Sequence, residues 1–531
     1  MIKRLINRLL GKGDGGPATP GLHLAGKRKD VPHSEHGIDP GLLDARALAV
    51  VSTLQEAGYE AYIVGGAVRD MMLGLRPKDF DVATNATPEQ VKGLFRRAFI
   101  IGRRFRIVHV VHGRGRDHEV IEVSTFRAYL DSAAAEQVAG NEKTSRAELS
   151  GKSHVVDASG RVLRDNVWGP QHEDAARRDF TVNALYYDPR TQVVVDYHGG
   201  IADAKKRLLR MIGEPLARYR EDPVRIVRAV RFAAKLGFEI EPKTRAPIRD
   251  CAVLLEAVPA SRLFDEMFKL LQTGHAGASI AQLKKYGLLA SEAGERGIFA
   301  LLDAVLADAS RRPERAAFIE AAFADTDRRV AEGKSVAPSF LLACLLWHEV
   351  LAGWQHRKSQ GEPAFPALQD AIETVFDARV GDISGRGKLG SDMREIWMMQ
   401  PRFERRSGAT PLSLVEQPRF RAGFDFLRLR SDCGEAPVEL AEWWEDFSLG
   451  DDEERRALLE EARAHEPRPR RTAPRSAAAV APGALAAAGE AAVATPAEDG
   501  DAPARKRRRR RRKPAGEALA GEAAPATDDA T

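Results

Sequence analysis

The stretch Ala61-Tyr-Ile-Val-Gly-Gly-Ala-Val-Arg-Asp70, followed by Lys78-Asp79-Phe80-Asp81, decides the fold of this chain. An apolar run ends in paired glycines, and an Arg-Asp pair and two carboxylates follow. Side chains two residues apart on an extended strand project from the same face, so the sequence predicts that Asp79 and Asp81 point side by side. Two such oxygen ligands suit Mg²⁺, which proteins bind through a few carboxylates together with substrate phosphates.

The glycines Gly65 and Gly66 add a second part to this predicted site. A backbone without Cβ can approach a phosphate closely, and amide groups at the start of the next helix can hold negative charge. Each part alone has a plainer explanation, since a lone Asp-x-Asp pattern is usually solvated and Gly-Gly after an apolar run is usually a turn. Their order and spacing together predict metal-assisted chemistry on a nucleoside triphosphate.

Length and composition are those of a multidomain soluble protein. The chain has 531 residues, and single hydrophobic cores stop growing near roughly 250 to 300 residues. Hydrophobic residues make up 44% of it, yet no run approaches the length of a membrane span, and the three cysteines are too far apart for a zinc pattern. We expect a cytoplasmic protein, in which Met1–Leu10 is either a frayed end or a short basic helix that touches a membrane surface or RNA.

The C-terminal tail contains an unbroken basic run from Arg505 to Lys513. Runs of this density are usually disordered and often bind polyanions by releasing counterions, although a solvated tail without a partner has the same composition. The tail therefore predicts RNA contact through the residues Arg505, Lys506, Arg507, Arg508 and Arg509.

Two later stretches also carry dense charge. The acidic start of Glu173-Asp-Ala-Ala-Arg-Arg-Asp179 predicts a helix that ends in closely spaced Arg and Asp residues. The range Tyr219–Gly237 predicts a basic amphipathic helix on which Arg225, Arg228 and Arg231 recur every three residues. Such a stripe is usually a solvated face, but guanidinium groups beside a triphosphate site suit phosphate and base-edge binding.

These stretches resemble the motifs of the nucleotidyltransferase superfamily, in the branch that holds bacterial poly(A) polymerases and CCA-adding enzymes. The glycine pair with the Asp-x-Asp resembles the active-site entry, and the range Arg177–Asn183 resembles the second motif. The range Asp196–Asp203 resembles the third, in which we expect the glycines to make a turn and Asp203 to cap the next helix. Glu221-Asp222-Pro-Val-Arg225 resembles the nucleotide-selecting motif.

The resemblance covers residues 38–465 and implies an α+β fold. The implied head contains a small mixed β-sheet, and all-α neck, body and leg regions follow it. From the residue pattern we expect a helix from Ile38 to Gly58 capped by Asp39, strands at 61–64 and 79–82, and a loop over 131–153. The predicted regions are a disordered segment 1–37, the head 38–187, the neck 188–258, the body 259–383, an RNA-binding region 384–465 and a disordered tail 466–531.

The resemblance also implies roles for single residues. Asp79 and Asp81 would hold two Mg²⁺ ions, with Mn²⁺ as an alternative. Asp179 is the preferred third metal-binding carboxylate, and Glu122 and Glu119 are open alternatives. If Asp179 does not bind metal, its expected role is a salt bridge that orients Arg178. Gly65 and Gly66 would bind the phosphates of ATP. Arg69 would contact a phosphate while Asp70 orients the Arg69 side chain, or Arg69 and Asp70 would form a purely structural pair. The residues expected to line the nucleotide's sugar and base are Arg178, Asn183, Asp222, Arg225 and Arg228.

One segment distinguishes the two kinds of enzyme within this branch. Ile100-Ile-Gly-Arg-Arg-Phe-Arg-Ile107 resembles the form found in poly(A) polymerases, with Arg103 and Arg104 as RNA-binding candidates. The resemblance therefore implies template-independent addition of AMP from ATP to RNA 3′ ends, a role in RNA decay, and RNA-decay proteins as partners of the tail. The rivals are a CCA-adding enzyme and a non-catalytic RNA-binding protein. Interleaved Arg and aromatic residues in 384–465 fit either base stacking or ordinary amphipathic helices.

Overall fold

An eight-stranded sheet forms the head of the chain in the computed structural model, which describes residues 26–102, 106–113, 119–129, 136–137, 154–156, 162–165, 167–289, 299–379 and 387–465. Its strands are β1 (Lys29–Pro32), β2 (Ala61–Val64), β3 (Asp81–Thr84), β4 (Ala98–Ile101), β5 (Ile107–His112), β6 (Glu119–Thr125), β10 (Leu185–Asp188) and β11 (Val193–Asp196). Their order across the sheet is β1-β11-β10-β2-β3-β6-β5-β4. β2 pairs antiparallel with β3 and β10, whereas β3 pairs parallel with β6, so the predicted mixed sheet is confirmed.

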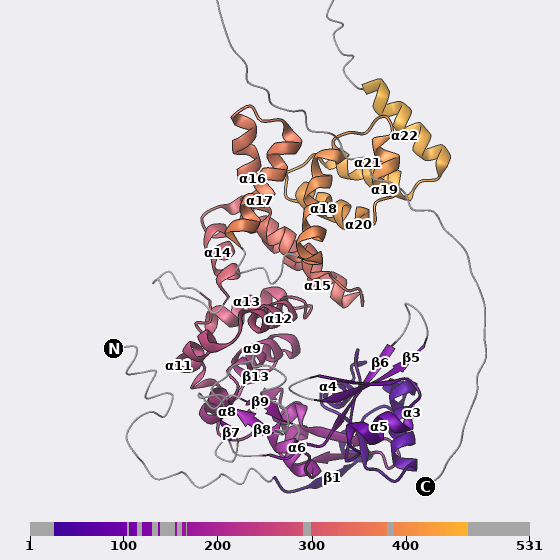
Figure 1. Cartoon of the computed structure of the whole chain (residues 1–531), viewed down its shortest axis with the longest axis vertical. Helices are drawn as coiled ribbons and strands as arrows, with labels where there is room; N and C mark the ends of the chain where they lie inside the picture. The colour runs from indigo at the N-terminus through magenta and orange to yellow at the C-terminus, as the bar shows by residue number, and fades with distance from the viewer. Residues whose placement is uncertain are drawn as a thin grey trace, which may run out of the picture. The chain divides into compact units, whose positions relative to one another are not determined.

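Alternate side chains of the sheet enter two different cores. Ile63 and Tyr187 belong to one core, while Val64 and Tyr186 belong to the other. This period of two is that of strands covered on both faces. Helices α3 (Ala45–Glu56), α4 (Gly66–Met72) and α5 (Pro88–Leu94) contribute to the first core, and α6 (Gln171–Arg177) contributes to the second (Figure 1).

The N-terminal edge of the sheet corrects two expectations. Residues 29–36 are not disordered: β1 pairs antiparallel with β11, which buries Val31, and α2 (His33–His36) follows. An edge strand that buries one side chain leaves no periodic pattern in the sequence. The helix expected from Ile38 also begins later, because Asp39 caps only the short turn η1 (Pro40–Leu42) and Asp44 caps α3.

The turn after β11 is fixed by Asp196. Its carboxylate accepts hydrogen bonds from the four amides of residues 198–201 at 2.8 to 3.0 Å. The prediction that Asp203 caps the next helix is therefore wrong, because Asp196 holds the start of α7 (Gly200–Lys205). Asp203 lies inside α7, where it accepts a hydrogen bond from the Thr181 hydroxyl at 2.7 Å. Since β11 pairs with β10, the sheet also extends beyond the predicted end of the head at residue 187.

Helices dominate the described chain beyond the sheet. The single helix expected over 219–237 is two helices that meet at Asp222-Pro223, where the proline removes an amide donor. The helices are α8 (Pro215–Glu221), α9 (Val224–Leu236), α10 (Pro242–Arg245), α11 (Ile248–Cys251), α12 (Ala260–Leu271), α13 (Ala276–Lys285), α14 (Ala300–Ala309), α15 (Pro313–Ala331), α16 (Pro338–Ser359), α17 (Ala364–Ala378), α18 (Lys388–Phe403), α19 (Thr410–Val415), α20 (Phe420–Asp432), α21 (Val438–Leu449) and α22 (Asp452–His465).

Short elements connect these parts. The helical turns η4 (Thr181–Asn183) and η5 (Ala252–Ala257) are separate from the longer helices, and β12 (Leu208–Leu209) pairs with β13 (Glu239–Ile240). A small second sheet joins β7 (Glu136–Gln137), β8 (His154–Val156) and β9 (Val162–Asp165). β7 lies within the loop expected over 131–153, and the remainder of that loop lies outside the described residues.

Buried aromatic rings decide between the two interpretations of the region 384–465. Trp397 and Phe426 lie in a core that begins at Phe180 in the predicted head and crosses both predicted boundaries of the body. Phe403, Phe424 and Trp444 lie in a separate core. Amphipathic helices are therefore confirmed as the cause of the pattern, and stacking of RNA bases on these rings is the wrong interpretation, since the rings are buried.

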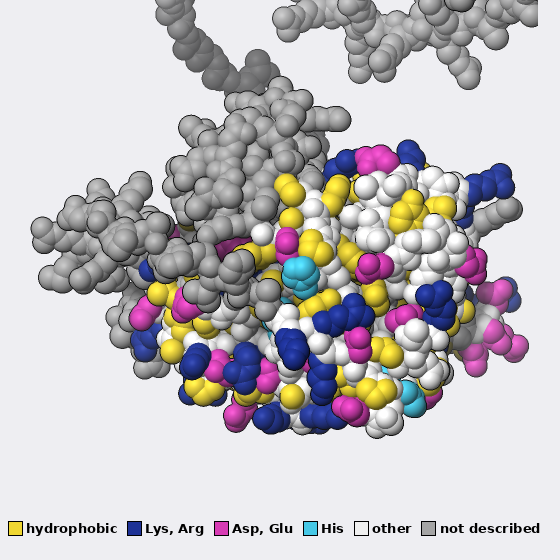
Figure 2. All heavy atoms as spheres, turned by 90° about the horizontal axis from the view of Figure 1, so that it is seen from below, with side chains coloured by type: hydrophobic (Ala, Val, Ile, Leu, Met, Phe, Trp, Pro, Cys, Tyr) yellow, Lys and Arg dark blue, Asp and Glu magenta, His cyan; other side chains and the backbone are white. Residues whose placement is uncertain are grey.

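The exposed surface is charged and mixed. Figure 2 shows basic and acidic side chains interspersed across the described atoms of one face. Within the described ranges, we find no helix whose length and hydropathy would let it traverse a lipid bilayer.

Candidate active site

Gly65 shapes the turn between β2 and α4. Its φ of 72° and ψ of −126° lie where residues with a Cβ are disfavoured. A Cβ at this position would also stand 3.3 Å from Nη1 of Arg178. The Gly65 amide donates to the Leu185 carbonyl of β10 at 3.1 Å, so it is already used within the sheet. The conformation of Gly65 brings Arg178 close to the turn, and phosphate binding by Gly65 and Gly66 stays a prediction.

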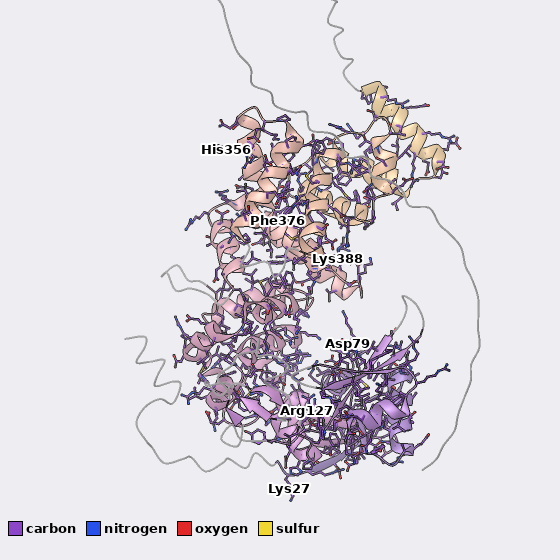
Figure 3. All side chains as sticks on the ribbon, viewed as in Figure 1. Lys27, Asp79, Arg127, His356, Phe376 and Lys388 are labelled. Atoms are coloured by element: carbon purple, nitrogen blue, oxygen red, sulfur yellow. The ribbon has the colours of Figure 1, made fainter. Side chains whose placement is uncertain are left out.

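The predicted carboxylate pair lies where β3 begins. Asp79 precedes the strand instead of lying on it, but buried Phe80 separates two exposed aspartates, as alternation requires. Figure 3 shows Asp79 at the margin of the head. Surrounding protein atoms reduce the hydration of the Asp81 carboxyl group, although the residue itself is exposed. That desolvation, together with the negative charges of Glu122 and Asp79, raises the pKa of Asp81 to about 6, against the opposing charge of Arg178.

Glu122 is the alternative third carboxylate that the sheet brings beside Asp81. The parallel pairing of β3 with β6 aligns these two residues, and the charge of Glu122 acts on the pKa of Asp81. The other alternative, Glu119, is the first residue of β6, three positions before Glu122, and forms an ion pair with Arg46. The preferred candidate, Asp179, is bound by Arg228 instead.

Asp179 and Arg228 form a nearly buried ion pair, with an Oδ2 to Nη2 distance of 2.6 Å. Asn183 donates to the other Asp179 oxygen at 3.1 Å, and the Phe180 amide donates to the same oxygen at 2.8 Å. Burial alone would raise the pKa of Asp179, but the charge of Arg228 and these hydrogen bonds outweigh it and lower the pKa to about 2. The alternative salt bridge of Asp179 with Arg178 is not the one that forms.

Arg69 extends this network into α4. Its side chain is 3% exposed, and its guanidinium donates to Asp70 at 2.6 Å and to the Asn183 side chain at 2.5 Å. The same group lies 5.5 Å from the ring centre of Phe232 on α9. Arg69 and Asp70 therefore pair with each other, which is the structural role predicted as the alternative to a phosphate contact by Arg69. Through Asn183 and Asp179 this pair connects α4 to α9.

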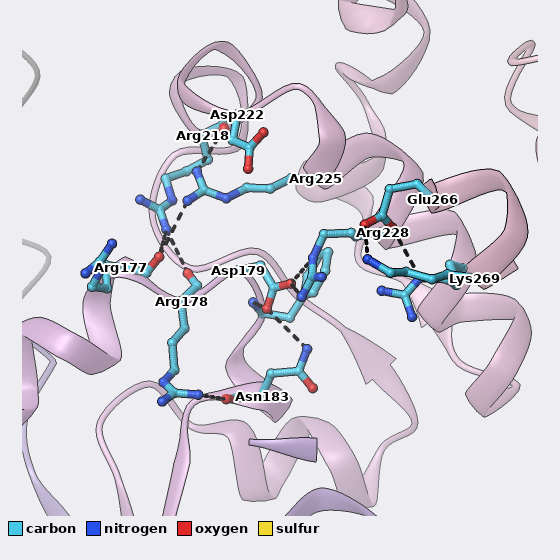
Figure 4. A network of polar contacts seen from close by, with 12 residues as sticks. Arg177, Arg178, Asp179, Asn183, Arg218, Asp222, Arg225, Arg228, Glu266 and Lys269 are labelled. Atoms are coloured by element: carbon cyan, nitrogen blue, oxygen red, sulfur yellow. Dashed lines mark hydrogen bonds and ion pairs between the residues drawn. The ribbon is translucent and has the colours of Figure 1, made fainter. Parts of the chain in front are cut away.

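Arg178 meets that network at the Asn183 carbonyl, to which its guanidinium donates at 3.4 Å (Figure 4). It donates to Asp174 at 3.2 Å and to the Tyr186 hydroxyl at 3.1 Å, and its guanidinium lies 5.1 Å from the Tyr186 ring centre. The Tyr186 hydroxyl also donates to Asp174, at 2.7 Å. The positive charge of Arg178 also acts on the pKa of Asp81. Among the predicted nucleotide-binding residues, Arg178 is therefore the one linked electrostatically to the carboxylates.

The nucleotide-selecting motif is held by ion pairs and hydrogen bonds, and Figure 4 shows its residues Asp222 and Arg225 beside Arg218. Arg225 donates to Glu221 at 2.9 Å and to the Arg218 carbonyl at 3.0 Å. Arg262 of α12 donates to Asp222 at 2.9 Å. These contacts fix the orientation of the motif at the start of α9, and the role of Asp222 and Arg225 in nucleotide selection stays a prediction.

Lys235 is a basic residue near the site that the sequence interpretation missed. Burial lowers the pKa of Lys235, the charge of Asp70 opposes that shift, and the charges of Arg69, Arg231 and Lys78 reinforce it. Lys235 follows Arg231 by four residues on α9, so continuing the arginine stripe at helical spacing would have found it. Lys78 directly precedes Asp79, so cations accompany the carboxylates.

The donor chemistry fits a magnesium ion. Asp79, Asp81 and Glu122 offer hard oxygen ligands, and the raised pKa of Asp81 reflects desolvation together with negative charge that a cation would neutralise. Among the described residues, no three His, Cys, Asp or Glu side chains, these three included, form a group placed to hold a metal ion. Mg²⁺ commonly takes its remaining ligands from water and substrate phosphates, so a partial protein set is compatible with it.

Several predicted contacts fall outside the described residues. Arg103 and Arg104 between β4 and β5, the first ten residues, and the tail residues from Arg505 to Arg509 belong to this group. Their roles stay predictions.

Three family models match the chain. They are described as the poly A polymerase head domain over residues 61–210, a probable RNA and SrmB-binding site of polymerase A over 237–291, and the polymerase A arginine-rich C-terminus over 360–477. Poly(A) polymerase I of Haemophilus influenzae is 39% identical over 442 residues, which cover 82% of this chain and 92% of the relative. Poly(A) polymerase I of Escherichia coli O157:H7 is 40% identical over 446 residues, covering 83% and 90%.

CCA-adding enzymes match less of the chain. The enzyme of Lactobacillus helveticus is 35% identical over 225 residues, which cover 42% of this chain and 49% of that enzyme. The crystal structure of the Bacillus stearothermophilus CCA-adding enzyme in complex with CTP has 25% identity and a TM-score of 0.41, covering 79% of this chain and 91% of that one. The family assignment therefore rests on the sequence matches.

The mixed sheet with carboxylates at the start of β3, together with the head-domain match, defines a nucleotidyltransferase. The long matches to poly(A) polymerase I at 39% to 40% identity narrow the assignment from this class of enzyme to one family. The chain belongs to the bacterial poly(A) polymerase I family.

Proposed function

We propose that the chain transfers AMP from ATP to the 3′-hydroxyl of RNA without a template and releases pyrophosphate. The observation that carries this proposal is the match to poly(A) polymerase I over more than four fifths of the chain, from the head to the C-terminal helices. In the reaction, the RNA 3′-oxygen bonds to the α-phosphorus as the bond to the pyrophosphate oxygen breaks.

Asp79 and Asp81 are the proposed magnesium ligands, and Glu122 now replaces Asp179 as the third carboxylate. The support is its alignment with Asp81 across β3 and β6 and its effect on the pKa of Asp81. When bound there, Mg²⁺ would lower the pKa of the RNA 3′-hydroxyl and neutralise charge on the triphosphate.

The cationic residues divide into two groups in this proposal. Arg178, whose charge reaches Asp81, and Lys78, which directly precedes Asp79, bind the phosphates of ATP together with Lys235, since guanidinium and ammonium groups complement phosphate oxygens. Arg69 and Arg228 are positioning residues, because their guanidiniums are bound to Asp70, Asn183 and Asp179. They keep α4 and α9 in fixed relation.

Asp222 and Arg225 are the proposed readers of the base. Adenine presents a donor at its amino group and an acceptor at N1, so one carboxylate and one guanidinium can recognise both without a nucleic acid template. Both side chains are already held by ion pairs, Asp222 with Arg262 and Arg225 with Glu221, so the support for base reading is the resemblance of the motif and not these contacts.

Extension of RNA primers with and without a 3′-hydroxyl tests the proposed reaction. With labelled ATP and Mg²⁺, we expect AMP to be added to an RNA primer that ends in a free 3′-hydroxyl, with one pyrophosphate released for each AMP. An otherwise identical primer with a 3′-deoxy end should accept none, because the attacking oxygen is missing. Equal incorporation into both primers, or hydrolysis of ATP without incorporation, would contradict the proposal.

A further inference from the structure

A hollow of about 320 Å³ lies outside the catalytic head, between the end of α9, β13, α10 and α13. Its walls combine apolar and polar groups. Ala233, Ala234 and Ile240 supply apolar surface, and the polar lining residues are Glu239, Arg245, Gln282, Lys285 and Tyr286.

The lining has the chemistry of a single-stranded nucleic acid site. Tyr286 offers an aromatic ring, and Nζ of Lys285 lies 5.6 Å from its centre. Arg245 lines the same hollow, and its charge opposes the rise in the pKa of Tyr286 that burial causes. An aromatic ring in a hollow with two cations suits a stacked base with its phosphate.

Gln282 adds a second, independent observation. Its side-chain oxygen is shielded from water and accepts no hydrogen bond from the described protein. A buried acceptor without a donor is unfavourable by roughly 1 to 3 kcal/mol, and a turn of the Gln282 amide into the hollow would let a ligand supply the donor. Base edges carry such donors, including the amino group of adenine.

We infer that this hollow takes one nucleotide of single-stranded RNA, with the base stacked on Tyr286, a base-edge donor on Gln282, and the phosphate between Arg245 and Lys285. The hollow lies almost entirely within the range 237–291, whose family description mentions RNA binding without defining a site. The inference rests on the proposed function for its RNA substrate. It adds a second point of RNA contact, separate from the 3′ end in the head.

Binding of a 5′-fluorescent A15 oligonucleotide to the full chain, measured by anisotropy without ATP, tests the inference. Tyr286→Leu should raise the Kd about tenfold, because base stacking on an aromatic ring is lost. Tyr286→Phe keeps the ring and should stay within about twofold of the wild type. Lys285→Gln should reduce the slope of log K against log salt by about 0.7, the value for one phosphate contact on a single strand.

Lys284→Gln is the matched control, since this neighbouring lysine of α13 does not line the hollow; its salt slope should not change. The Leu and Phe variants should unfold at the same urea concentration, which separates lost binding from lost folding. Unchanged A15 affinity in Tyr286→Leu with an unchanged slope in Lys285→Gln would overturn the inference and favour a protein ligand. Because no ATP is present, these results are independent of whether the wild type adds AMP, which tests the proposed function alone.

Discussion

Asp81→Ala should abolish AMP incorporation while RNA binding stays within about twofold of the wild type. Asp81 lies next to Glu122 and close to Asp79, so its removal takes away a charge at the centre of the proposed metal site. Loss of one preorganised electrostatic group from an active site lowers kcat by about 10² to 10³-fold, and loss of a metal ligand should reach at least this range. Primer extension and A15 anisotropy measure the two effects separately.

Two further variants control this result. Asp81→Asn keeps the shape and removes the charge, so it should be as inactive as Asp81→Ala. Glu56→Ala removes an equal charge from the exposed end of α3 and should leave extension unchanged. If Asp81→Ala kept more than a tenth of the wild-type rate, the proposed metal site would be wrong, and a non-catalytic role for the carboxylates would follow.

Arg228→Ala should lower the free energy of unfolding by about 3 kcal/mol. The variant leaves the Asp179 carboxylate buried without its cation, since that side chain is 9% exposed. We expect the lower part of the known range for broken buried pairs because the Arg228 side chain is 33% exposed. It also removes the guanidinium 5.3 Å from the Phe232 ring centre. Urea unfolding at pH 7, followed by circular dichroism, measures the change.

The pKa of Asp179 gives this prediction a pH dependence. The folded pKa of about 2 lies below the ordinary 3.8, so the pair stabilises the fold above about pH 4 and loses its effect as the pH falls toward 2. In Arg228→Ala the pKa of Asp179 is raised instead, because the cation no longer opposes the effect of burial. The stability difference between wild type and Arg228→Ala should therefore begin to shrink above pH 4 and be smallest near pH 2. The double variant Arg228→Ala with Asp179→Ala should be more stable than Arg228→Ala alone. A double variant that is less stable would refute the role of an uncompensated carboxylate.

Sequence signals predicted those elements of the head whose formation depends on residues close to them in the sequence. The strand before Gly65 and the helix capped by Thr87 were both confirmed, because an apolar run ending at glycine and a Thr-Pro start act within a few residues. β1 was missed because its pairing partner β11 lies more than 160 residues away.

The partners of the predicted site residues depend on distant contacts. Asp179 was preferred as the third carboxylate because of its motif, but Arg228 of α9 binds it, and no pattern near Asp179 indicates that pair. The alignment of Glu122 with Asp81 required the register of a parallel strand pair, which spacing along the chain does not determine. Asp196 replaced Asp203 as a cap for a related reason, since either aspartate fitted the turn by sequence.

Supplying each nucleotide separately to the full chain with a defined RNA primer tests the central claim most directly. On an unstructured RNA with a free 3′-hydroxyl, we expect long tails with ATP and Mg²⁺ and negligible extension with CTP, GTP or UTP. A transfer RNA that lacks its CCA end serves as the second primer. A short extension that requires CTP on that transfer RNA, without tails on the unstructured primer, would contradict the account and identify a CCA-adding activity.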